Sequence, residues 1–209
     1  MEAGIDRIRQ AIRGLVRHVA VWLNKVSKGK ISPDFITYIG LLMHIPIAFL
    51  IAYGVNYWAA GLLVIFGLFD TLDGELARIQ GVSSTRGMLL DASTDKMKEV
   101  LLYTGAGLAL AQSSSPAWAA WAVAACGASL TVSFVKAKGE AAIAANDKVY
   151  DHATLNKIFA DGLMRFEIRM SVLIAGLLFN QLAIAIALIA VLAGMTAIGR
   201  LQRIFKELD

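Results

Sequence analysis

Four aspartates stand at helical spacings in two apolar stretches of the sequence. Asp70 and Asp73 are three positions apart, and Asp91 and Asp95 are four positions apart. Side chains at these spacings lie on one face of a helix, so the members of each pair can act together. If the two stretches form an antiparallel helical hairpin, the pairs can face each other. We therefore expect one oxygen-rich site built from four carboxylates.

Such a site has defined chemistry. Carboxylates at membrane depth cost several kcal/mol unless they are paired or bind a cation. Oxygen ligands without a suitable His or Cys favour Mg²⁺, Mn²⁺ or Ca²⁺ over zinc or copper. Four carboxylates can hold two such ions, which suits a displacement at phosphate. The structural alternative is ion pairing with nearby bases, namely Arg78, Arg86, Lys96 or Lys98.

Small residues accompany the acids. Gly74, Ala77 and Gly87 leave space where larger side chains would stand. That space could admit a flat base or a diphosphate. It could equally serve close helix packing, for which small residues are common in membranes.

The composition is that of a membrane protein. Of the 209 residues, 57% are hydrophobic and 17% are charged, whereas soluble domains carry about 25% charged residues. This excludes disordered, collagen-like and disulfide-rich secreted chains. Segments 101–135 and 170–199 contain no formal charge. Both are longer than the roughly 20 residues that one span needs, so each must fold back, at turn signals near 112–116 and 180–181.

The elements that position the acids are predicted from these patterns. We expect an all-α, polytopic protein with six transmembrane helices over residues 35–53, 57–79, 89–111, 116–137, 162–179 and 182–203. Residues 5–27 repeat apolar side chains at helical spacing among Arg and Lys, which predicts an amphipathic helix on the cytoplasmic leaflet. The alternative is a solvated helix that packs on the protein. The expected division is residues 1–31 for this juxtamembrane helix and 32–209 for the six-helix domain.

The basic residues predict the orientation. The connections near 54–56, 112–116 and 180–181 carry no charge, whereas the others carry Lys and Arg. Basic short loops mark the cytoplasmic side. We therefore expect a multi-pass protein of the cytoplasmic membrane, with both termini and the acidic site facing the cytoplasm. The basic N-terminal segment is explained by the membrane surface rather than by nucleic acid.

The acids belong to a longer pattern with fixed spacing: Asp70, Asp73, Gly74, Ala77, Arg78, Gly87, Asp91 and Asp95. This pattern resembles the signature of the CDP-alcohol phosphotransferase family. Family members are membrane enzymes, commonly homodimers, in which an acceptor hydroxyl displaces CMP from a CDP-linked lipid such as CDP-diacylglycerol.

The resemblance also implies roles. Asp70, Asp73 and Asp91 match metal ligands, and Asp95 matches a ligand that also serves as general base. The implied cofactor is Mg²⁺, as two ions, with Mn²⁺ as an alternative. The CDP-lipid would contact Asp70, Asp73, Gly74, Ala77, Arg78 and Gly87.

Basic residues in the second half of the sequence bear on the identity of the acceptor alcohol. Lys136, Arg169 and Arg203 could converge from three helices at one depth beside the metal site, which favours an anionic acceptor such as a polyol phosphate. The alternative is anchoring of span ends at the membrane surface. The stretch around Ser133 resembles the phosphatidylinositol-phosphate synthase branch of the family. That likeness implies inositol phosphate binding by Ser133, Lys136, Arg169 and Arg203. It implies nucleotide contacts by Pro33, Asp34, Phe35, Ile36 and Ser84.

Three other interpretations remain open at this point. Glycerol-3-phosphate is also anionic and would make the protein a phosphatidylglycerol-phosphate synthase. A divalent-cation transporter also uses intramembrane carboxylates, but here the acids stand only in the expected cytoplasmic half. A scaffold without catalysis has no need of four metal-spaced acids. The residues favour an enzyme over these alternatives, and the resemblance implies that it transfers a lipid phosphate group to inositol phosphate.

Overall fold

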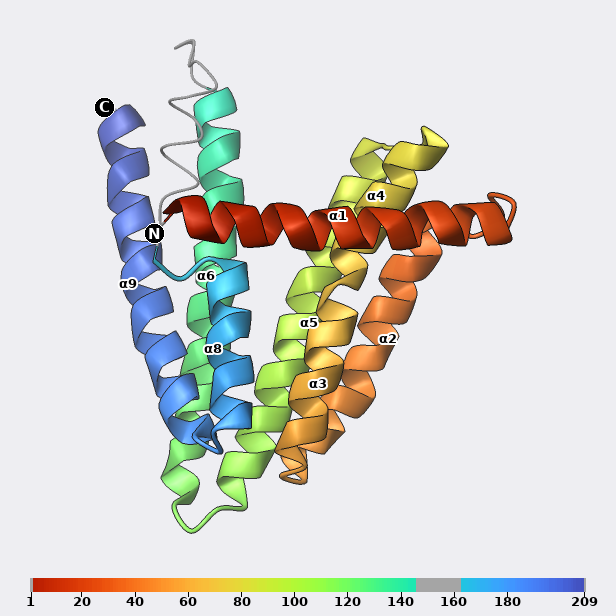
Figure 1. Cartoon of the computed structure of the whole chain (residues 1–209). Coiled ribbons are helices and arrows are strands. Elements are labelled where there is room, and N and C mark those ends of the chain that lie inside the picture. The colour runs from red at the N-terminus through yellow and green to blue at the C-terminus, as the bar shows by residue number, and fades with distance from the viewer. Residues whose placement is uncertain (1, 146–162, 209) are drawn as a thin grey trace. The chain divides into compact units, whose positions relative to one another are not determined.

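The computed structural model describes residues 2–145 and 163–208, and the side chains from residue 12 onward within these ranges. The described residues contain helices and no strand, which confirms the all-α prediction. The elements in chain order (Figure 1) are α1 (Glu2–Val26), α2 (Pro33–Ala52), α3 (Asn56–Gly67), α4 (Phe69–Gln80), α5 (Thr85–Ala111), the 3₁₀ turn η1 (Pro116–Trp118), α6 (Ala119–Ala144), α8 (Phe166–Leu178) and α9 (Leu182–Leu208).

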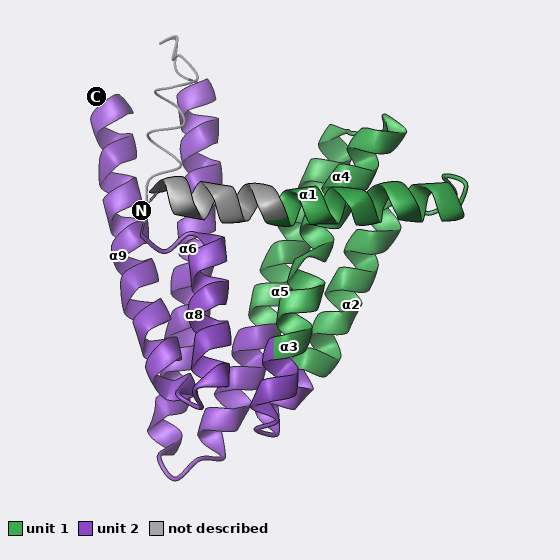
Figure 2. Cartoon of the chain, viewed as in Figure 1, with its two compact units in different colours: residues 1–47, 61–101 green, residues 48–60, 102–209 purple. Residues whose placement is uncertain are grey.

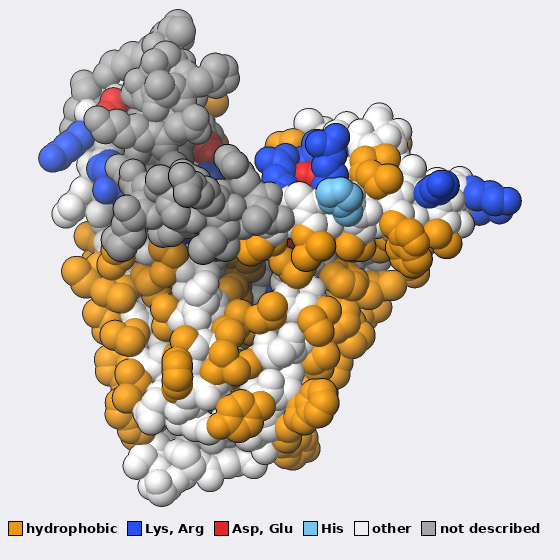
Figure 3. Space-filling model, viewed as in Figure 1, with side chains coloured by type: hydrophobic (Ala, Val, Ile, Leu, Met, Phe, Trp, Pro, Cys, Tyr) orange, Lys and Arg blue, Asp and Glu red, His pale blue; other side chains and the backbone are white. Residues whose placement is uncertain are grey.

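Three helical segments of the described chain are long and apolar enough to cross a membrane. They are α2, the segment Pro116–Ala144 and α9. Many of their large apolar side chains are exposed, including Val123 at 75% and Ile198 at 61%. Figure 3 shows hydrophobic side chains spread widely over the visible face. Exposed apolar surface of this extent suits lipid rather than water, so the chain is a membrane protein.

The limits of the predicted spans differ from those of the helices in the structure, and one span is interrupted. The expectation of one uninterrupted helix over 57–79 is wrong, because α3 ends at Gly67 and α4 begins at Phe69. Glycine weakens a helix interior, and here the Leu68 amide donates to the Ile65 carbonyl at 3.2 Å, a 3₁₀-type bond that marks a local break. The predicted span 162–179 begins outside the described residues, and its described helix, α8, starts at Phe166.

The chain divides into two compact units (Figure 2). Unit 1 comprises residues 1–47 and 61–101, and unit 2 comprises residues 48–60 and 102–209. The four aspartates lie in unit 1. The basic residues expected to bind the acceptor lie in unit 2.

In unit 1, α1 packs on α4. Val16 and Ala20 of α1 form a buried cluster with Leu72 and Leu76 of α4, joined by Ile36 of α2. Residues 2–26 are helical, and the cluster shows that one side of α1 packs on the protein. Its other side leaves apolar residues exposed, namely Leu15, Trp22 and Val26.

In unit 2, the three uncharged connections lie at one end. Asn56 Nδ2 donates to Asn180 Oδ1 at 2.9 Å, and Asn180 Nδ2 donates to the Tyr57 hydroxyl at 3.2 Å. Gln112 Nε2 reaches the Ala52 carbonyl at 3.4 Å. Gly54 and Asn180 have positive φ angles of 73° and 53°, which end α2 and α8 sharply. The predicted turns are thus confirmed.

Two contacts of α5 set its packing in unit 2. The hydroxyls of Tyr103 and Ser129 are 3.0 Å apart, and both residues are buried. Gly105 lies so close to the backbone of Ala48 that an added Cβ would overlap the Ala48 carbonyl oxygen. The glycine is therefore required for this close approach.

Candidate active site

The acids of unit 1 are carried by two consecutive helices: Asp70 and Asp73 lie in the first half of α4, and Asp91 and Asp95 lie in the first half of α5. Gly81 ends α4 with φ 67°, and the amides of Gly81 and Val82 donate to the carbonyls of Arg78 and Ala77. This is the Schellman pattern of a helix C-terminus. Ser84 then caps α5, because its hydroxyl accepts a hydrogen bond from the Gly87 amide at 3.1 Å. The short connection brings the two acidic helix faces together, as the sequence predicted.

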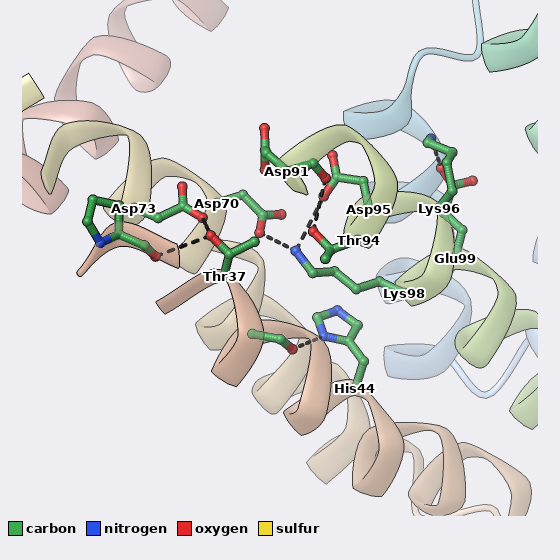
Figure 4. A network of polar contacts seen from close by, with 12 residues as sticks. Thr37, His44, Asp70, Asp73, Asp91, Thr94, Asp95, Lys96, Lys98 and Glu99 are labelled. Carbon is green, nitrogen blue, oxygen red and sulfur yellow. Dashed lines mark hydrogen bonds and ion pairs between the residues drawn. The ribbon is translucent and has the colours of Figure 1, made fainter. Parts of the chain in front are cut away.

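Three of the four aspartates form a group that could hold a metal ion (Figure 4). Asp70, Asp91 and Asp95 each offer an oxygen within 4.8 Å of the other two. Asp91 Oδ1 is buried and has no hydrogen-bond partner among the residues that the structure describes. A buried, unpaired carboxylate oxygen is costly unless a cation satisfies it. The donor set contains only carboxylate oxygens, which fits Mg²⁺ or Mn²⁺.

Asp73, which is not in this group of three, is hydrogen-bonded to Thr37 of α2. Thr37 Oγ1 is 2.5 Å from Asp73 Oδ2 and 3.2 Å from the Pro33 carbonyl. The hydroxyl has a single hydrogen, and the shorter contact shows that it donates to Asp73. Asp73 is only 5% exposed, so this bond fixes a buried carboxylate. Thr37 was not predicted as a site residue, because nothing in its spacing relates it to the acids.

Lys98 is the second site residue that the metal interpretation did not include. Its side chain is 1% exposed, and its ammonium forms ion pairs with Asp70 and, at 3.3 Å, with Asp95. The predicted ion-pair alternative is therefore present in part. Of the four bases named for it, Lys98 alone contacts the motif acids in the described chain. The other bases pair elsewhere, in the pairs Arg78–Glu75, Arg86–Asp34 and Lys96–Glu99.

Glu75 organises the side of α4 that faces α1. It is buried and accepts hydrogen bonds from Arg13 Nε and Arg78 Nη2, each at 2.7 Å. With Arg17, these residues line a hollow of about 440 Å³, and basic side chains gather in this region of Figure 3. A Cβ on Gly74 would come within 3.7 Å of the Arg78 guanidinium. Gly74 therefore lies in van der Waals range of this guanidinium.

The start of α2 accounts structurally for several residues predicted to contact the nucleotide. Ser32 caps the helix by accepting from the Phe35 amide at 3.2 Å, and Pro33 occupies the first helical position, where proline is favoured. Ile36 is buried in the cluster with α1 and α4. Asp34 and Phe35 remain accessible, with Asp34 3.6 Å from Arg86.

Unit 2 groups arginines from α8 and α9. Arg169 is 1% exposed and donates to the Met164 carbonyl at 2.7 Å. Arg200 is 4% exposed and donates to the Val132 carbonyl of α6 at 2.8 Å. Its charged neighbours are Arg169, Arg203 and Glu140. Arg200 was not predicted, although its position three residues before Arg203 places both on one helix face.

The other two residues predicted for the acceptor lie on α6. Lys136 is exposed and pairs with Glu140 at 3.7 Å. Ser133 is half-buried, and its hydroxyl donates to the Ser129 carbonyl at 3.5 Å. Glu140 therefore neighbours both Lys136 and Arg200, so the basic residues of α6 and α9 share one carboxylate.

The family follows from a comparison with known proteins. Residues 30–198 match the model of the CDP-alcohol phosphatidyltransferases, and the chain belongs to this family. The match includes every aspartate of the site together with Thr37 and Lys98.

Several relatives carry names from one branch of the family. The chain is 34% identical to phosphatidylinositol phosphate synthase of Cutibacterium acnes over 116 residues, 54% of this chain and 56% of that protein. It is 32% identical to the enzyme of the same name from Corynebacterium glutamicum over 136 residues, 64% of this chain and 61% of that protein. Archaetidylinositol phosphate synthase of Pyrococcus horikoshii is 28% identical over 98% of both chains. The matches thus span about three fifths of the two bacterial relatives.

Solved structures share the fold. Phosphatidylinositol phosphate synthase of Mycobacterium tuberculosis, solved with CDP-DAG bound, superposes with a TM-score of 0.76 at 22% identity, covering 91% of this chain and 93% of that one. The same protein in complex with manganese and citrate gives a TM-score of 0.77, covering 91% and 88%. At this identity the comparison establishes the fold.

Proposed function

We propose that this protein transfers a phosphatidyl group from a CDP-lipid such as CDP-diacylglycerol to a hydroxyl of inositol phosphate and releases CMP. The observation that carries the proposal is the group formed by Asp70, Asp91 and Asp95, whose oxygens lie within 4.8 Å of one another inside the family's motif. The names of the bacterial relatives support inositol phosphate as the acceptor.

The proposed reaction assigns a step to Asp95. The acceptor oxygen forms a bond to the lipid-bearing phosphorus, and the bond from that phosphorus to CMP breaks. Asp95 takes the proton of the attacking hydroxyl, which a carboxylate within hydrogen-bond reach can do. Two divalent ions, Mg²⁺ or Mn²⁺, would be held by the four aspartates and would neutralise charge on the diphosphate. Thr37 orients Asp73 for this purpose.

The substrate contacts are assigned by the same reasoning. The cytidine diphosphate would lie along α4 over Gly74, Ala77 and Arg78, with Asp34 and Phe35 accessible nearby on α2. The acceptor phosphate would bind the hydroxyl of Ser133 and the basic side chains of unit 2, namely Lys136, Arg169 and Arg203, with Arg200 as an addition. Guanidinium groups suit phosphate because they donate two parallel hydrogen bonds.

The membrane arrangement is also proposed. Residues 32–209 would form six spans in the cytoplasmic membrane, with both termini and the acids on the cytoplasmic side and α1 on the leaflet surface. The meeting of the three uncharged turns at one end of unit 2 supports this orientation. A cysteine placed by Ser114→Cys should react with an impermeant maleimide in intact cells, whereas one placed by Gln80→Cys should not, in a background with Cys126→Ser. The family resemblance adds a homodimer, which native mass spectrometry would detect.

The decisive experiment is CMP release by the full chain in lipid nanodiscs with Mg²⁺ and CDP-diacylglycerol. Inositol phosphate, free inositol, glycerol-3-phosphate and serine are supplied in parallel. We expect release with inositol phosphate, a loss of about 100-fold or more for Asp95→Asn, and wild-type release for Glu167→Gln, an exposed acid on α8. Release with glycerol-3-phosphate alone would retain the reaction and reject the acceptor. No release with any acceptor would reject the proposal.

A further inference from the structure

Lys98 is a buried cation for which the proposed reaction has no role. It is 1% exposed, and its ammonium contacts Asp70 and Asp95, two of the three carboxylates in the group described above. Figure 4 shows the side chain reaching from α5 toward these acids. A buried ammonium is tolerated only when it is paired. The two acids therefore hold Lys98 at the place where a metal ion would bind.

An ammonium and a divalent ion compete for the negative charge of the same two carboxylates. Mg²⁺ requires its oxygen ligands at about 2.0–2.1 Å in near-octahedral geometry. The oxygens that Lys98 contacts are Oδ1 of Asp70 and Oδ1 of Asp95. Two cations on the same carboxylates also repel each other strongly where water is scarce. Metal binding must therefore either displace Lys98 or proceed against its charge.

The flexibility of the Lys98 side chain bears on this competition. Lysine carries its charge on a flexible four-carbon stem, and Lys98 runs along Gly40 of α2. A Cβ on Gly40 would lie 3.9 Å from both Cε and Nζ of Lys98. The Lys98 side chain therefore lies in van der Waals range of the α2 backbone at Gly40.

We propose that Lys98 is an internal competitor for the divalent cation. It neutralises Asp70 and Asp95 when the site holds no ion, and an incoming ion competes with its ammonium for these carboxylates. The protein thereby keeps its acidic site stable without metal, at the cost of weaker metal affinity. This inference rests on the proposed function, because the same carboxylates are assigned there as ligands.

The test measures Mn²⁺ binding directly, without substrate. The full chain in nanodiscs is titrated with Mn²⁺, and free ion is followed by its electron paramagnetic resonance signal. Lys98→Met removes the charge and keeps the length of the side chain. Lys96→Met is the matched control, because Lys96 also lies on α5 but pairs with Glu99, away from the acidic group. We expect Lys98→Met to bind Mn²⁺ about tenfold more tightly than wild type, with Lys96→Met unchanged.

The outcomes separate this inference from the proposed function. Equal or weaker Mn²⁺ binding by Lys98→Met would overturn the role of Lys98 and leave the metal site standing. No Mn²⁺ binding by wild type or by any variant would reject the metal site itself, and the competitor with it. If Lys98→Met does not fold, Lys98→Gln, which retains hydrogen-bond donors without the charge, is titrated in its place with the same expected gain.

Discussion

Replacing Thr37 by valine tests whether a residue outside the acidic motif holds one of its carboxylates. Valine has the same shape but no hydroxyl, so Thr37→Val removes the hydrogen bond to Asp73 Oδ2 and leaves the packing of α2 nearly unchanged. Thr37 is 4% exposed and Asp73 is 5% exposed. Water therefore cannot readily take the place of the lost donor.

The size of the effect follows from this burial. A hydrogen bond to a charged group contributes about 1.5–3 kcal/mol to stability. If the same free energy is lost from the transition state, kcat/KM for CMP release falls by about 10- to 150-fold. Thr37→Ser keeps the hydroxyl and loses only a methyl group, which costs about 1 kcal/mol of stability. Its kcat/KM should remain near that of wild type.

Two measurements on the same nanodisc preparations decide the matter. CMP release gives kcat/KM, and thermal unfolding without metal gives the change in stability. We expect Thr37→Val to lose both and Thr37→Ser to lose a little stability alone. Wild-type kcat/KM and an unchanged unfolding midpoint for Thr37→Val would refute the reasoning, because Asp73 would then need no support from α2.

Three further predictions concern other contacts. Gly105→Ala should destabilise the protein by about 1–3 kcal/mol in thermal unfolding, because the new Cβ would overlap the Ala48 carbonyl oxygen. Gly127→Ala should leave the stability unchanged, because a Cβ at that position meets open space. Glu75→Gln should weaken the attachment of α1 by only about 1 kcal/mol, because its partners Arg13 and Arg78 are half exposed to solvent. Faster amide hydrogen exchange in residues 12–26 would show this weakening, and unchanged exchange would contradict the prediction. Arg203→Met should raise KM for inositol phosphate by about tenfold without changing KM for CDP-diacylglycerol. Lys206→Met, at an exposed position, is the control. An equal rise in both KM values would reject the assignment of Arg203 to the acceptor phosphate.

The sequence predicted the helical hairpin and its acids because local rules governed both. The spacing of Asp70 to Asp73 and of Asp91 to Asp95 sets helix faces regardless of the rest of the chain. The residues Gly81 and Ser84 then end one helix and begin the next. The uncharged turns were likewise predictable, because glycine and asparagine accept positive φ angles.

The contacts between distant segments were not predictable in the same way. Thr37 reaches Asp73 from another helix, and Arg13 reaches Glu75 from α1. Such pairs depend on how helices pack, which one sequence without its relatives does not reveal. The break at Leu68 was missed because the apolar run continues through it. Arg200 was passed over because basic residues near the end of a span are common for unrelated reasons.

The hydrogen bond between Tyr103 and Ser129 bears on how this protein can change during evolution. Apolar helix faces in lipid slide past one another with little preference, since lipid contacts replace helix contacts at small cost. The buried polar pair between Tyr103 of α5 and Ser129 of α6 favours one alignment. The connection from residue 112 to residue 118 then need not set the alignment of the two helices. It can lengthen, shorten or change composition among relatives while the two helices keep the same register.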